Sequence, residues 1–83
     1  MNQPINRNKY QAYLEAYARE AVRGSDGTPH GIREYLDSIR ITGAFVKDKA
    51  EKQRALADLI QAFTEHRHWP LEIILSQLGI KQP

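Results

Sequence analysis

The chain has 83 residues, of which 12 are Lys or Arg and 10 are Asp or Glu, so its formal net charge is +2. It contains no cysteine, which excludes a disulfide framework and a thiolate zinc site. A chain of this length forms one domain with a small core, and small domains often supplement such a core by association. We therefore expect a single domain over residues 1–83, with flexible ends at residues 1–5 and 81–83.

The first predicted helix covers residues 7–23. Asn6 is suited to cap its amino end, and Gly24 to end it in the left-handed conformation. Asp26 and Gly27 then belong to a turn of small polar residues. Apolar and aromatic residues recur along one face at a period of 3.6 residues: Tyr10, Tyr13, Leu14, Tyr17, Ala18 and Ala21.

The second predicted helix covers residues 29–42. Thr28 is placed to cap it through its hydroxyl group, and Pro29 takes the first helical position, where no N–H is needed. Arg33 and Asp37 are four residues apart and are expected to form an ion pair. The apolar face of this helix consists of Ile32, Tyr35, Leu36 and Ile39.

The third predicted helix covers residues 49–66. Asp48 and Glu51 have the spacing of a capping box, with Asp in place of the usual Ser or Thr. Arg54 and Asp58 form a second candidate ion pair, away from the buried side. The apolar face consists of Leu56, Leu59, Ile60 and Phe63.

The fourth predicted helix covers residues 70–78. It begins at Pro70 and ends at Gly79, after which Ile80 is expected to fold back onto the last turn. Its main apolar face consists of Leu71, Ile74, Leu75 and Leu78. Together these periodic segments predict an all-α fold, a small four-helix domain.

Ile73 departs from the pattern of the fourth helix because it points away from the main apolar face. A helix that is apolar on all sides is buried on two sides, and in so small a domain the second side can be another subunit. Other apolar residues lie outside the main faces and extend the predicted protein interface: Trp69, Phe45 and Val46. The alternative is that loops of the same chain cover them.

The first helix offers a different candidate surface. Its basic side chains suited to contact phosphate are Lys9, Arg19, Arg23 and Arg7. Ala12 and Ala16 lie between them and leave room for a polyanion, whereas Glu15 and Glu20 reduce the positive potential. This pattern makes a nucleic-acid-binding regulator the alternative function, and an ordinary solvated face the simpler interpretation.

His66 and His68 lie beside Trp69 in the joint before the fourth helix. Residues two apart on a helix point to different sides, so these histidines do not form an obvious metal site. A polar joint with Trp69 packed on the core is the simpler interpretation, and a metal- or proton-responsive switch at these histidines is the open alternative. The sequence therefore predicts no metal and no cofactor.

Known catalytic signatures are absent from the chain: it has no HExxH, no P-loop, no GxSxG and no dinucleotide fingerprint. It also has no recognisable signal peptide and no apolar run of about 18 residues. We therefore expect a cytoplasmic protein that is neither an enzyme nor a membrane protein. The leading hypothesis is a regulator or adaptor that binds another protein or itself, as a homodimer.

Overall fold

The computed structural model describes residues 5–42 and 50–80, with side chains as far as Arg40 in the first range. Within these ranges the chain forms four helices and no strand. The helices are α1 (Arg7–Gly24), α2 (Pro29–Thr42), α3 (Ala50–Glu65) and α4 (Leu71–Gln77). The predicted all-α four-helix fold is confirmed, and every helix end lies within one residue of its predicted position.

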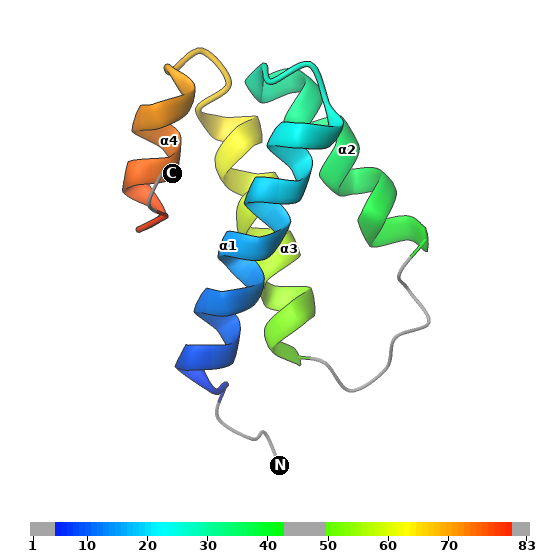
Figure 1. The fold of residues 1–83 in the computed structure, drawn as a ribbon, viewed down its shortest axis with the longest axis vertical. Helices are drawn as coiled ribbons and strands as arrows, with labels where there is room; N and C mark the ends of the chain where they lie inside the picture. The colour runs from blue at the N-terminus through cyan, green and yellow to red at the C-terminus, as the bar shows by residue number, and fades with distance from the viewer. Residues whose placement is uncertain (1–4, 43–49, 81–83) are drawn as a thin grey trace.

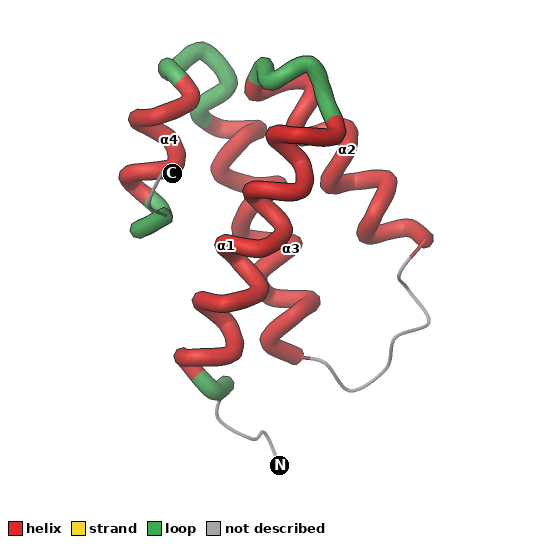
Figure 2. Tube along the Cα trace, in the orientation of Figure 1, coloured by secondary structure: helices red, strands yellow, loops and turns green. Residues whose placement is uncertain are grey.

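The three long helices pack on one another, and the short α4 lies on the opposite side of α1 and α3 from α2 (Figure 1). α1 and α3 run in the same direction, whereas α2 and α4 run back. The amino ends of α1 and α3 meet where the Asn6 N–H donates to Glu51 Oε2 at 2.9 Å. The α1–α2 turn and the α3–α4 joint lie together at the other end (Figure 2).

A single apolar core joins the helices. Its largest fully buried side chains come from all four: Leu14, Ile32, Leu36, Leu59, Phe63 and Ile74. Each contributes about 1.5–3 kcal/mol of transfer free energy relative to an exposed position. Ala18, Ala21 and Ala55 are also buried, and their small side chains let the helix axes approach closely.

The predicted amino-terminal caps of α1 and α2 are present. The side-chain oxygen of Asn6 accepts from the Lys9 N–H at 3.1 Å. The Thr28 hydroxyl accepts from the Gly31 N–H at 3.1 Å. Each contact satisfies a backbone donor that has no partner inside its helix. The predicted Asp48 cap lies outside the described residues.

The carboxyl end of α4 also follows the prediction. Gly79 has a φ of 74°, in the left-handed region, and reverses the chain direction. The Ile80 N–H then donates to the Leu75 carbonyl at 2.9 Å, as in a Schellman motif. Ile80 is thereby returned to the core, where its side chain is only 5% exposed.

The prediction for Gly24 was wrong. Gly24 is the last helical residue of α1 rather than a left-handed cap, and the extended Ser25 ends the helix. The reason for glycine here is tertiary, because the aromatic ring of Tyr35 on α2 occupies the space that a Cβ would need. Gly24 therefore allows close packing between α1 and α2.

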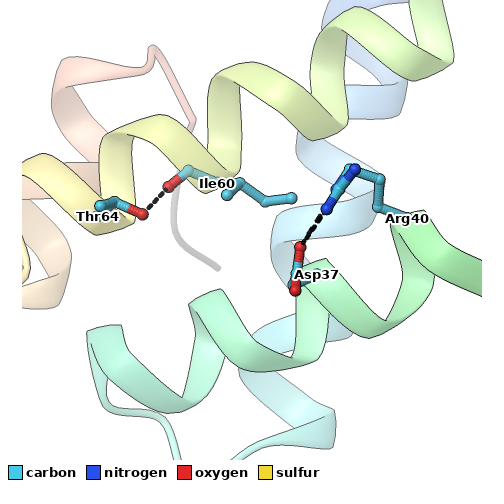
Figure 3. A network of polar contacts seen from close by, with 4 residues as sticks. All are labelled: Asp37, Arg40, Ile60 and Thr64. Atoms are coloured by element: carbon cyan, nitrogen blue, oxygen red, sulfur yellow. Dashed lines mark hydrogen bonds and ion pairs between the residues drawn. The ribbon is translucent and has the colours of Figure 1, made fainter.

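The predicted pair of Arg33 and Asp37 does not form. Asp37 instead accepts from Arg40, with Arg40 Nη2 2.8 Å from Asp37 Oδ1 (Figure 3). Figure 3 also shows a contact within α3, where the Thr64 hydroxyl donates to the Ile60 carbonyl at 2.7 Å. Both contacts are local to one helix and exposed, so they add little to the packing of the bundle.

Candidate interaction surface

Ile73 lies on the outer side of α4 with 45% of its surface exposed. Among the described residues it is the large hydrophobic side chain left exposed to solvent. Its neighbours Ile74 and Leu75 are both buried in the core, so α4 packs by one side only. Ile73 thus presents apolar surface that this chain's described residues do not cover.

Trp69 holds the joint between α3 and α4. Its ring stacks on His66, with ring centroids 3.8 Å apart and planes 16° from parallel. The backbone N–H of Trp69 donates to the His66 carbonyl at 2.9 Å, and the side chain packs partly against the core. Of the predicted interface, Ile73 is therefore exposed and Trp69 is half-buried. Phe45 and Val46 lie outside the described residues.

A groove of about 250 Å³ runs between α3 and α4, and we call it the α3–α4 groove. Its apolar part is formed by Ala62, Ile74 and Leu78. Its other lining residues are polar or aromatic: Tyr10, Asp58, Gln61, Glu65, His66 and Gln77. Gln77 lies one turn after Ile73 on the same side of α4, so Ile73 neighbours a lining residue of this groove without lining it itself.

A second cavity of about 350 Å³ adjoins the groove, and we call it the α1–α3 hollow. Residues from the start of α1 and from α3 enclose it. Its lining consists of Ile5, Arg7, Tyr10, Gln11, Arg54 and Asp58. Because Tyr10 and Asp58 line both cavities, they form the boundary between them.

Tyr10 and Asp58 are joined by a hydrogen bond between helices. The Tyr10 hydroxyl donates to Asp58 Oδ2 at 2.5 Å, and Arg54 Nε lies 3.6 Å from Asp58 Oδ1. Burial, followed by the hydrogen bond to Asp58 and its negative charge, raises the pKa of Tyr10 to about 12. The predicted pair of Arg54 and Asp58 is confirmed, and Tyr10 is the member that the sequence analysis missed. The sequence did hold one indication of this contact, because the hydroxyl of a half-buried tyrosine needs a polar partner.

The basic residues predicted on the first helix do not all share a face. Lys9, Arg19 and Arg23 are exposed on the side away from the core. Arg19 is partly neutralised, because Arg19 Nη2 lies 3.5 Å from Glu15 Oε1. Arg7 is two positions before Lys9, which rotates it about 200° around the helix, and it lines the α1–α3 hollow instead.

The three histidines have different surroundings. His66 is engaged with Trp69, His68 is exposed, and His30 lies 3.1 Å from Glu34 on α2. The described part of the chain contains no group of three or more His, Cys, Asp or Glu side chains suited to hold a metal ion. None of its helices has both the length and the apolar character needed to cross a bilayer.

The chain matches no family model, no curated protein and no solved structure. The fold defines it as a small all-α protein.

Proposed function

We propose that this chain is a small, non-enzymatic regulator or adaptor that acts in the cytoplasm by binding protein, and that it forms a homodimer through α4. The observation that carries the proposal is the exposure of Ile73, one helical turn before Gln77, which lines the α3–α4 groove. An exposed isoleucine beside a partly apolar cavity has the composition of an interface centre, with polar groups around it.

The arrangement of Ile73 and the groove is suited to a second copy of the chain. In a two-fold dimer, residue i of one subunit contacts residue j of the other, and j contacts i. A projecting side chain and a receiving cavity must then lie on the same side of each subunit. Ile73 and the α3–α4 groove meet this requirement, so each Ile73 would fill the partner's groove. The polar rim would include Glu65 and Gln77.

Light scattering coupled to size-exclusion chromatography tests this proposal over a range of protein concentrations. The wild-type chain should form dimers, and Ile73→Asp should be monomeric because it places a charge at the centre of the interface. Ala57→Asp is the matched control, since Ala57 is exposed on α3 and outside the groove. A wild-type chain that stays monomeric at every concentration, or an Ile73→Asp variant that still dimerises, would overturn the proposal.

The basic side of α1 supports nucleic-acid binding as the second candidate function. Lys9, Arg19 and Arg23 are exposed there beside the small residues Ala12 and Ala16. Fluorescence polarisation with labelled duplex DNA should then show affinity that falls with salt, with a logarithmic slope of about −0.9 per phosphate contacted. Replacing Arg23 by Gln should reduce that slope. Absence of binding at about 50 mM salt would remove this candidate.

A further inference from the structure

The α1–α3 hollow carries more positive than negative charge. Arg7 and Arg54 line it from two different helices, and Asp58 is its acidic residue. The side chain of Arg7 has no hydrogen bond or ion pair with any described residue, so its guanidinium keeps its full capacity to donate. Five N–H groups in a planar fork make arginine well suited to bind a planar oxyanion such as a carboxylate.

The negative charge of Asp58 is already engaged within the protein. Its Oδ2 accepts from the Tyr10 hydroxyl at 2.5 Å, and its Oδ1 lies 3.6 Å from Arg54 Nε. A ligand anion in the hollow therefore lies near an Asp58 carboxylate that already has two partners. Arg54 and Asp58 thus offset each other, and the charge of Arg7 leaves the hollow with a net positive charge.

The rest of the hollow is suited to an apolar body. Ile5 and the ring of Tyr10 are half-buried lining residues. Gln11 is held in place because its amide nitrogen donates to Glu15 Oε2 at 3.2 Å and to the Gly79 carbonyl at 3.3 Å. A volume of about 350 Å³ is at the lower end of the range found for small-molecule sites.

We propose that the α1–α3 hollow is a binding site for a small carboxylic acid with an apolar or aromatic body. Arg7 binds the carboxylate, Arg54 offsets the negative charge of Asp58, and the apolar body packs against Ile5 and the Tyr10 ring. This site is independent of the proposed dimer, which uses Ile73 on α4.

Amide chemical shifts of the full chain measured by NMR test the proposal, with benzoate as the probe. Benzamide has nearly the same shape and no charge, so it is the matched control ligand. Benzoate should shift the amide signals of Arg7, Tyr10 and Arg54 in a saturable way, and benzamide should not. A third titration uses inorganic phosphate, which has negative charge but no apolar body. Weaker binding of phosphate than of benzoate shows that the apolar body is recognised together with the charge.

Two variants then test whether the charge of Arg7 binds the benzoate carboxylate. Arg7→Gln should weaken benzoate binding about tenfold, the loss expected for one charge-assisted hydrogen bond. Arg23→Gln is the matched control, because it removes the same charge from the opposite side of α1 and should leave the affinity unchanged. Both positions are exposed, and circular dichroism verifies that both variants fold.

Four outcomes would overturn the proposal. They are equal shifts with benzamide, equal loss of affinity in the two variants, shifts spread over the Lys9 and Arg19 side of α1, and phosphate binding as strong as that of benzoate. The last two outcomes would reduce the effect to nonspecific attraction of anions. A monomeric wild-type chain would overturn the dimer and leave this site unaffected, so the two failures are distinguishable.

Discussion

Tyr10 on α1 donates a hydrogen bond to Asp58 on α3 at 2.5 Å, and this contact separates the α1–α3 hollow from the α3–α4 groove. The two residues are 48 positions apart in sequence. Their contact holds the first half of α1 against the middle of α3, beside the α1–α3 hollow. The same pair therefore stabilises the fold and lines both the α1–α3 hollow and the α3–α4 groove.

Replacing Tyr10 by Phe should lower the free energy of unfolding by about 1 kcal/mol. The change removes a hydrogen bond to a carboxylate and leaves Asp58 with Arg54 as its remaining partner. Urea denaturation followed by circular dichroism measures the loss. Tyr13→Phe is the matched control, because the Tyr13 hydroxyl has no hydrogen bond among the described residues, and its change should stay within about 0.5 kcal/mol. Equal losses in both variants would contradict the prediction.

The stability of the protein should fall at alkaline pH through Tyr10. Its pKa is about 12 in the folded chain, against 10.0 for the unperturbed group. Because the folded pKa is the higher one, its stabilising contribution is complete below pH 10.0 and is lost as the pH rises toward about 12.

Melting temperatures measured as a function of pH test this prediction. The wild type should lose stability over this range faster than Tyr10→Phe. The pKa of Tyr35 is raised in the same direction by burial and by its hydrogen bond to Glu20, and both proteins share this effect. Curves that run parallel through the whole range would show that Tyr10 does not contribute.

Replacing Gly24 by Ala should destabilise the protein, although alanine favours a helix by about 1 kcal/mol over glycine. The added Cβ would collide with the ring of Tyr35, which must then move and lose its 3.2 Å hydrogen bond to Glu20. Thermal unfolding measures the effect. In a Tyr35→Ala background the collision is absent, so the same substitution should become stabilising. A stabilising effect in both backgrounds would contradict close packing at this position.

Replacing Gly79 by Ala should cost about 1–2 kcal/mol, because its φ of 74° is unfavourable for a residue with a Cβ. The strain opposes the bond from the Ile80 N–H to the Leu75 carbonyl. A lower melting temperature measures the loss. Ser76→Ala is the matched control, since Ser76 is exposed in the last turn of α4 and alanine is compatible with its conformation. An unchanged melting temperature in Gly79→Ala would show that the turn does not hold Ile80 in the core.

The sequence by itself determined the helices and most of their ends. The 3.6-residue period, the caps at Asn6 and Thr28 and the turn at Gly79 depend on residues within one or two turns of each other. The exposure of Ile73 also agrees with the pattern of its own helix, since the opposite side of α4 carries the buried residues.

The tertiary structure decided every feature that joins residues far apart in the chain. The role of Gly24 depends on Tyr35 from the next helix, and the partner of Tyr10 is Asp58 on α3. The position of Arg7 in the α1–α3 hollow depends on how α1 lies against α3. Periodicity tells which side of a helix is buried, but only the packing of the helices brings particular side chains together. Cavities form between helices, so the α3–α4 groove and the α1–α3 hollow have no local signal in the sequence.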